Sequence, residues 1–286
     1  MNLERHHDPS IRSISAGYKH TVGLKSDGSA FAIGQNKYGQ CDVKDWHDII
    51  AVAVANAHAG NGHTVGLKTD RTVIATGWNK YGQCDVEEWN DIIAIAAGWR
   101  RTLAITSRRT VLAIGQNKEG QCEVGSWREI LTVSAGDWHT VGLMTDHTVL
   151  AVGNNRYHQC DVTSWKNIIA ISAGYLHTVA LMCDGSVVAC GINTYGQCDV
   201  GLWNDIIAIS AGSHHTVGLK KDGTVVATGW NAQHQCDVLT WRNIVSVSAG
   251  CDHTVALRND GICLAIGDQS HGQCDIEEWM KQSIQQ

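Results

Sequence analysis

Alternating apolar and polar positions predict a chain built of short β-strands. In the first unit, IRSISAG (11–17) has the period of two that a half-buried strand shows, and HTVGL (20–24) and SAFAIG (29–34) are the second and third predicted strands. An Asp-Gly pair, the strongest short hairpin signal, lies between the second and third runs. QCDV (40–43) is a candidate for a short fourth strand. Because no segment has a helical period, we expect an all-β fold.

The same pattern recurs seven times, and the recurrence predicts the architecture. A segment close to GQCDV-x-x-W is centred on cysteines spaced 38 residues apart, except for a first spacing of 43: Cys41, Cys84, Cys122, Cys160, Cys198, Cys236 and Cys274. The longer spacing reflects five extra residues around 55–62. Short antiparallel units of this size cannot bury their faces alone and must stack against one another.

We therefore predict a seven-bladed β-propeller with three- or four-stranded antiparallel blades. An open solenoid is the competing architecture, but solenoids need atypical capping repeats, and the seventh unit is as regular as the fourth. The expected organisation is a polar N-terminal tail at 1–10, a single propeller domain at 11–279 and a short C-terminal tail at 280–286.

Two repeated features indicate packing between blades. The middle of the second strand is always glycine or alanine, which indicates that another backbone comes close there: Gly23, Gly66, Ala104, Gly142, Ala180, Gly218 and Ala256. A tryptophan follows each repeated cysteine by five residues, and we expect it to wedge between blades: Trp46, Trp89, Trp127, Trp165, Trp203, Trp241 and Trp279.

Composition narrows the function classes. The chain has 22 basic and 28 acidic residues and a net charge of −6, which does not favour nucleic-acid binding. No apolar run resembles a secretory signal or a membrane span, so we expect no membrane association. Seven of the eleven cysteines occupy equivalent places in successive units, too far apart to pair. Reduced cysteines favour a cytoplasmic location. We expect a monomer.

Two repeated polar positions invite a metal-site interpretation. The first is a histidine that recurs in six units, with arginine in the third: His20, His63, Arg101, His139, His177, His215 and His253. No Cys–His pair has zinc-ligand spacing, so we predict hydrogen bonding to the neighbouring threonines instead. The second is the acidic residue after each repeated cysteine, which we interpret as protection of an outer edge strand. We expect no metal and no cofactor.

No catalytic constellation is visible. The chain has neither a glycine-rich phosphate loop with a lysine nor a serine nucleophile elbow. Turns account for the thirty glycines. An enzymatic activity is therefore unsupported.

The repeat AG-x-x-HTVGL-x-x-DG-x-VVA-x-G-x-N-x-x-GQ resembles that of the regulator-of-chromosome-condensation family of seven-bladed β-propellers. The resemblance covers residues 11–279, and the short repeats are similar to the compact bacterial version, which includes a propeller that inhibits β-lactamases. That inhibitor grips a protein with one aromatic-rich face. The eukaryotic namesake is an exchange factor for a small GTPase, but its wedge-like insertion and basic tail have no counterpart in this chain.

Function is best sought where the units differ. The loops after the first and third strands should emerge on one face, and they contain all six tyrosines and the four tryptophans outside the packing set. Counting Arg101, this face has seven basic and four acidic groups and is expected to be weakly basic. Aromatic residues and arginine are enriched at binding hot spots. The candidate partner-binding residues are Tyr18, Lys19, Lys37, Tyr38, Trp78, Lys80, Tyr81, Trp99, Arg100, Trp138, Arg156, Tyr157, Tyr175, Tyr195, His214, Trp230 and His234.

Three hypotheses remain open at this point. The first is a non-catalytic scaffold that binds a protein partner through the aromatic face. The second is a carbohydrate-binding propeller, in which tryptophan and tyrosine rings contact sugar faces. The third, exchange-factor activity on a small GTPase, rests on the family resemblance alone.

Overall fold

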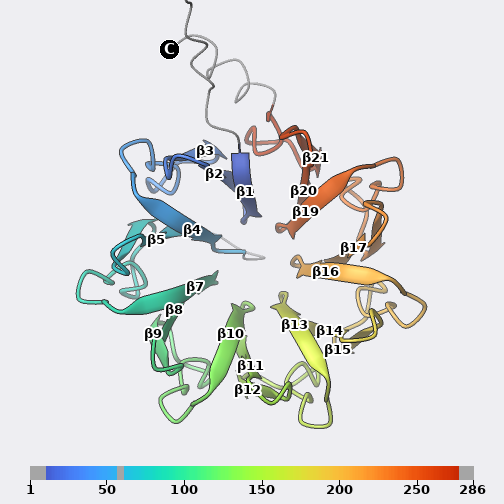
Figure 1. Cartoon of the computed structure of the whole chain (residues 1–286), viewed down its shortest axis with the longest axis horizontal. Helices are drawn as coiled ribbons and strands as arrows, with labels where there is room; N and C mark the ends of the chain where they lie inside the picture. Colours follow the sequence, from blue (N-terminus) through green and yellow to red (C-terminus); the bar gives the residue numbers. More distant parts are fainter. Residues whose placement is uncertain (1–10, 57–60, 277–286) are drawn as a thin grey trace, which may run out of the picture.

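Seven three-stranded antiparallel sheets form a closed ring in the computed structural model, which describes residues 11–56 and 61–276 (Figure 1). Each sheet contains three consecutive strands in chain order. No helix occurs in the described residues. The predicted all-β, seven-bladed propeller is confirmed. The predicted tails and Trp279 lie outside the described residues.

The first strand of each blade lies nearest the axis, the second in the middle and the third outermost (Figure 1). The inner strands are β1 (Ile11–Ala16), β4 (Ile49–Val54), β7 (Ile92–Gly98), β10 (Ile130–Ala135), β13 (Ile168–Ala173), β16 (Ile206–Ala211) and β19 (Ile244–Ala249). The middle strands are β2 (His20–Lys25), β5 (His63–Lys68), β8 (Arg101–Thr106), β11 (His139–Met144), β14 (His177–Met182), β17 (His215–Lys220) and β20 (His253–Arg258). The outer strands are β3 (Ala30–Gly34), β6 (Val73–Gly77), β9 (Val111–Gly115), β12 (Val149–Gly153), β15 (Val187–Gly191), β18 (Val225–Gly229) and β21 (Cys263–Gly267).

The candidate fourth strand, QCDV at 40–43, is a turn, so each blade has three strands and that prediction is wrong. The backbone amide of Asp42 donates to the carbonyl of Gly39, and the Asp42 carboxylate accepts a hydrogen bond from the Asn36 side chain at 2.7 Å. The backbone amide of Cys41 donates to the Asn36 side-chain oxygen at 2.8 Å. The repeated carboxylate therefore stabilises a loop. This corrects the interpretation that the acidic residue after each repeated cysteine protects an outer edge strand.

The repeated tryptophan packs between neighbouring blades, as predicted. Trp46, only 6% exposed, belongs to a core cluster that includes Leu24 of the first blade and Ile49 of the second. Trp127 lies against the mid-strand glycine of the next blade, so that a Cβ atom added to Gly142 would be 2.5 Å from its ring. The group beside the mid-strand glycines is therefore an aromatic ring and not another backbone, which corrects that prediction.

We predict that Gly142→Val lowers the free energy of unfolding by about 1–3 kcal/mol, because the new side chain would overlap Trp127. Gly201→Val is the matched control, since nothing lies within 4 Å of a Cβ atom there. Urea unfolding measures both. Equal stability of the two variants would contradict the packing explanation.

A buried hydrogen-bonded relay joins each blade to the next. The Nε2 atom of His215, in the sixth blade, lies 2.9 Å from the Thr254 hydroxyl oxygen in the seventh. Thr254 in turn donates its hydroxyl hydrogen to the main-chain carbonyl of Gln235 at 2.8 Å. The other five histidines make the same contact at 2.8–3.1 Å, and Arg101 Nε donates to Thr140 at 3.1 Å. The predicted histidine–threonine bonding is confirmed.

The relay closes the ring through the first and last blades. His253 contacts the Thr21 hydroxyl at 2.9 Å, and Thr21 donates to the carbonyl of Gln273 at 2.8 Å. The backbone amide of Ala16 also donates to the Ser248 hydroxyl at 2.9 Å. Closure therefore uses the histidine–threonine relay of the other junctions, and the alanine–serine bond recurs at three of them.

Desolvation by burial lowers the pKa of all six relay histidines, to about 3 for His20, His139, His177 and His215 and to about 4 for His63 and His253. Each ring has a buried Nδ1 atom with no hydrogen-bond partner. The native rings are therefore neutral at physiological pH.

We predict that the relay histidines contribute their full share to the free energy of unfolding above about pH 6.5, and that this contribution decreases as the pH falls towards 4. The unfolded chain takes up protons on these histidines below pH 6.5, whereas the native rings stay neutral until the pH approaches their lowered pKa values. Each histidine should contribute a slope of about 1.4 kcal/mol per pH unit. Urea titrations at pH 7.5, 6.0 and 5.0 measure the slope.

A free energy of unfolding that stays constant between pH 7.5 and 5.0 would contradict this account of the relay.

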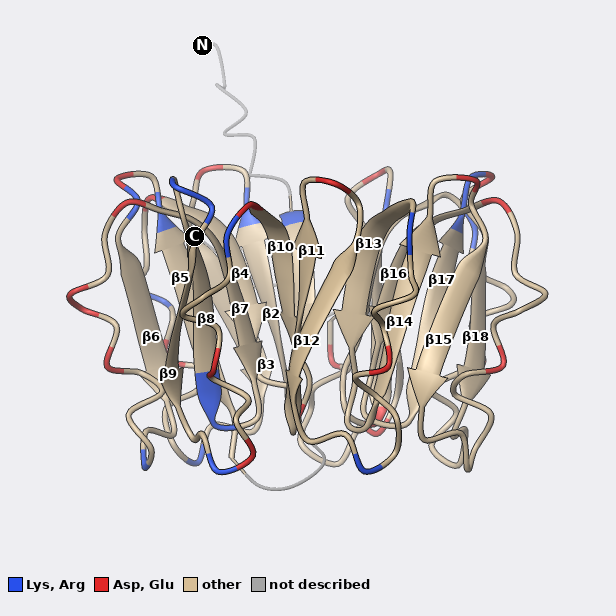
Figure 2. Cartoon of the chain, turned by 90° about the horizontal axis from the view of Figure 1, so that it is seen from below, with Lys and Arg blue, Asp and Glu red and all other residues tan. Residues whose placement is uncertain are grey.

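The two rims of the ring are built differently (Figure 2). One rim, the hairpin face, carries the turns between middle and outer strands. Three of these turns have Arg71, Arg109 or His147 where other blades have glycine, and all three residues keep the left-handed backbone, with φ of 57–67°. The other rim, the loop face, carries the loops after the inner and outer strands.

The unit-two insertion contributes a contact across the axis on the loop face. Asn56, directly after β4, donates its side-chain amide to the carbonyls of Ala211 and Ala249, both at 3.3 Å. Those carbonyls end β16 and β19, on the far side of the ring (Figure 1). The insertion therefore links the second blade to the sixth and seventh.

Candidate functional site

The repeated polar side chains are committed to the scaffold. Every relay histidine uses Nε2 to contact a threonine, and the part of the chain that the structure describes contains no group of three or more His, Cys, Asp or Glu side chains suited to a metal ion. The functional face must therefore be sought among the loops.

The cysteines are also structural. All eleven are free, and the repeated thiols contact the backbone carbonyl six residues earlier, as Cys198 does with Ile192 at 3.4 Å. Burial raises the pKa of the Cys198 thiol to about 12, which suppresses the thiolate. Cys183, in the hairpin after β14, is the exposed exception.

We predict that one thiol per native chain, Cys183, reacts rapidly with a chromogenic disulfide reagent. Its exposure makes it accessible, whereas the thiols with raised pKa values provide little thiolate. Stopped-flow absorbance should show one fast thiol before denaturation and eleven after it. Persistence of the fast phase in Cys183→Ser would contradict the assignment.

Six aromatic side chains form a continuous line across the loop face of blades three to six. We call this line the aromatic arc: Trp99, Trp138, Tyr175, His214, Tyr195 and Trp230. The Trp99 and Trp138 ring centroids are 4.5 Å apart, and Trp138 shares a hydrogen bond with Tyr175. His214 lies 5.2 Å from Tyr175 and 5.5 Å from Tyr195, which lies 4.6 Å from Trp230. All the ring pairs are edge-to-face.

Arg100 extends the arc towards the second blade. Its guanidinium lies 3.6 Å from the Trp99 ring centroid, 5.3 Å from that of Trp78 and 5.2 Å from that of Tyr81. One terminal nitrogen donates to the Tyr81 hydroxyl at 3.2 Å and to Gln116 at 3.3 Å. The three rings and the guanidinium form one cluster, the Arg100 cluster.

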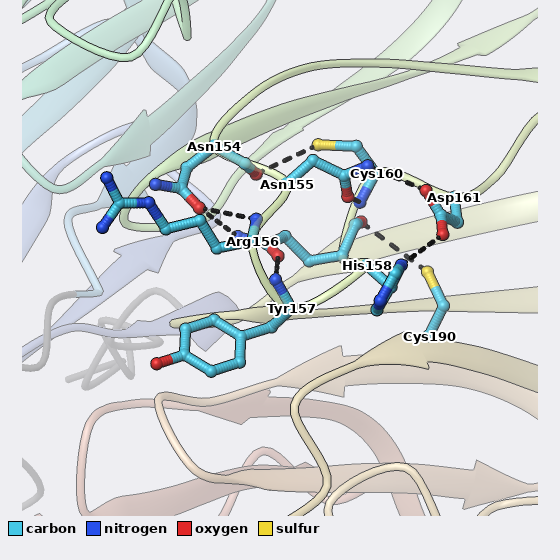
Figure 3. A network of polar contacts seen from close by, with 9 residues as sticks. Asn154, Asn155, Arg156, Tyr157, His158, Cys160, Asp161 and Cys190 are labelled. Atoms are coloured by element: carbon cyan, nitrogen blue, oxygen red, sulfur yellow. Dashed lines mark hydrogen bonds and ion pairs between the residues drawn. The ribbon is translucent and has the colours of Figure 1, made fainter.

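A cavity of about 200 Å³ opens beside the arc in the fourth blade. It is lined by Glu119, Trp138, Asn154, Arg156, Tyr157, Tyr175 and Leu176. The Asn154 amide donates to Glu119 at 2.8 Å and so joins the loops of blades three and four. In Figure 3, Arg156 and Tyr157 extend away from the paired His158 and Asp161.

The remaining predicted residues lie outside the arc. Lys19 lies over the ring of Tyr18 at 5.4 Å, and Lys37 over that of Tyr38 at 5.2 Å, both in the first blade. Lys80 is exposed beside the Arg100 cluster in sequence. His234 instead pairs with Asp237 at 2.8 Å within its own loop.

Four residues of the site were not among the predicted ones. Gln116 orients Arg100, and Glu119, Asn154 and Leu176 line the cavity. Their only signal in the sequence is that they occupy variable positions in the same loops. A rule that selects aromatic and basic side chains passes over them.

The expected weakly basic character of this face stays a prediction, with one contributor removed. Arg101 is fully buried and belongs to the relay, so it adds no surface charge. The repeated carboxylates, exemplified by Asp42 and Asp161, are exposed and bond to the asparagines of the same loops. Figure 2 shows both signs of charge along this rim.

The fold and its loops define a seven-bladed β-propeller of compact repeats, with one face made of side chains that do not repeat. The family model for the regulator of chromosome condensation (RCC1) repeat matches seven segments: 11–40, 54–83, 92–121, 130–159, 168–197, 206–235 and 244–273. The chain belongs to this repeat family.

Solved structures show the same fold at low sequence identity. The ectodomain of the Physcomitrella patens receptor kinase CR4 matches with a TM-score of 0.74 and 18% identity, over 91% of this chain and 74% of that one. Human WBSCR16 matches with a TM-score of 0.69 and 18% identity, over 90% and 87%. Saccharomyces cerevisiae Prp20p matches with a TM-score of 0.54 and 19% identity, over 90% and 72%.

No curated protein sequence matches the chain. The described residues include no helix that could cross a membrane.

Proposed function

We propose that the chain is a non-catalytic protein-interaction scaffold that binds a partner protein through the aromatic arc. The observation that carries the proposal is the arc itself: six rings from four consecutive blades in contact with one another, all at positions that the repeat leaves variable. Packing of the ring does not require these residues, because the corresponding positions of other blades hold different side chains.

The physical properties of the arc suit a protein interface. Large aromatic side chains with few rotatable bonds are enriched at hot spots, since they bury much area at little entropic cost. Edge-to-face contacts already restrict the rings before binding, which reduces the ordering cost of association. One of the related structures, yeast Prp20p, has binding properties to Gsp1p and histones. A propeller with this fold can therefore bind protein partners.

Carbohydrate binding is the second candidate function, and the cavity is the observation that favours it. Trp138 and Tyr157 offer ring faces, while Asn154 and Arg156 offer hydrogen-bond donors. However, the aromatic positions change from blade to blade, whereas a lectin propeller is expected to repeat its pocket. The protein scaffold is therefore the better supported function.

We predict that replacing Trp138 and Tyr195 together by alanine weakens partner binding at least 30-fold, because two arc contacts worth about 2 kcal/mol in combination are lost. The partner is first captured by affinity purification with the full chain and identified by mass spectrometry. The affinities of purified proteins are then measured by calorimetry.

The matched control replaces the two most exposed apolar residues outside the arc, Leu202 and Leu239, which are 94% and 73% exposed. This variant should bind the partner as the unaltered protein does. Equal loss in both double variants, or loss in neither, would overturn the proposal. Arc-dependent binding of a glycan on an array, without protein binding, would favour the second function.

A further inference from the structure

The third blade departs from the repeat in two linked ways. Arg101 replaces the relay histidine, and its guanidinium reaches into the fourth blade, where it donates to the backbone carbonyls of Asp137 and His139. The inner strand β7 also continues to Gly98, which pairs with Arg101. Only two residues, Trp99 and Arg100, therefore connect β7 to β8, whereas three residues connect β10 to β11.

This shortened turn holds Arg100 in a left-handed conformation, with φ of +63°. Such a backbone costs a non-glycine residue about 1 kcal/mol. The residues that directly precede the histidine in other blades, such as Trp138 and His214, do not have this conformation. Glycine at this position would adopt the same backbone without strain. The presence of arginine therefore points to a role for its side chain.

The guanidinium of Arg100 is held in place by neutral groups only. It stacks on Trp99 at 3.6 Å, and its bonded nitrogen donates to Tyr81 and Gln116. Among the residues that the structure describes, no carboxylate forms an ion pair with it. The second terminal nitrogen makes no hydrogen bond and is not among the buried unpaired atoms, so it remains accessible to a ligand.

We propose that Arg100 is a preformed anchor for a side-chain carboxylate of the partner protein. The proposal rests on the proposed function and adds the chemistry of one contact. A carboxylate would accept hydrogen bonds from the second terminal nitrogen, because both hydrogens of the first are already donated to Tyr81 and Gln116. Because the aromatic stacking already fixes the side chain, less conformational entropy is lost on binding.

The test uses the purified full chain and two small probes, N-acetylglutamate N-methylamide and its glutamine analogue. Two-dimensional NMR follows the indole N–H of Trp99 during titration. We expect a saturable shift with the glutamate probe and at least tenfold weaker binding of the neutral probe. Arg100→Gln should abolish the response, and Arg100→Lys should weaken it severalfold, because an ammonium group does not stack on the aromatic rings as the planar guanidinium does.

Arg109→Gln is the matched control. Arg109 also has a left-handed backbone, with φ of +57°, and lies in the same blade on the hairpin face, so this substitution should leave the response unchanged. Urea unfolding checks that both glutamine variants are folded. Equal binding of the two probes, or a response that survives Arg100→Gln, would overturn the proposal.

A second measurement, the binding of the partner protein, distinguishes this inference from the proposed function. Arg100→Gln should weaken partner binding at least tenfold at low salt. If the arc variant loses binding and Arg100→Gln does not, the anchor is wrong and the scaffold function stands. If the probes bind through Arg100 and the arc variant keeps its partner, the scaffold function through the arc is wrong and the carboxylate site stands.

Discussion

The hydrogen bond between blades at the repeated threonine is the interaction on which the rest of the ring depends. Each threonine hydroxyl has one hydrogen, and a main-chain glutamine carbonyl, which can only accept, receives it. The hydroxyl oxygen must therefore accept a hydrogen bond from the neighbouring blade. This requirement fixes a hydrogen on Nε2 of each histidine and leaves Nδ1 as an unpaired acceptor, in agreement with the buried Nδ1 atoms.

The same requirement explains why arginine can replace histidine in the third blade. Arg101 presents a nitrogen–hydrogen donor to Thr140, as histidine does elsewhere, and so preserves the junction. A carboxylate or an amide oxygen at this position would leave the threonine without a donor. The longer arginine side chain also satisfies two carbonyls of the next blade, and with it comes the tight turn that positions Trp99 and Arg100.

Much of the fold could be predicted from the sequence because it is periodic. Seven repeats predicted the blade number, and the histidine next to threonine predicted their hydrogen bond. The glycine or alanine of each middle strand indicated a close approach, but by another backbone and not by the tryptophan ring that lies there. QCDV at 40–43 was misread as a strand since its alternation comes from loop closure: Val43 is buried while Asp42 bonds to Asn36. Burial of Arg101 was equally invisible, because a repeat position does not reveal what surrounds it.

The loop residues were predicted as a set, but their arrangement was not. Contact between Trp99 and Trp138, from loops 39 positions apart, depends on the spacing and tilt of neighbouring blades. Those are properties of the closed ring and of no single repeat. For the same reason Gln116 and Glu119 gained their roles only through the positions of Arg100 and Asn154.

Scaffold and surface are connected through the chain, since some residues of the arc and of the Arg100 cluster directly precede a relay residue. Trp138 precedes His139, His214 precedes His215, and Arg100 precedes Arg101. Because each relay side chain is fully buried and bonded to the next blade, it fixes the backbone from which the adjacent aromatic side chain projects. The edge-to-face spacings of the arc therefore follow from the blade junctions, and a rigid ring presents its variable residues in a fixed geometry without an ordered partner.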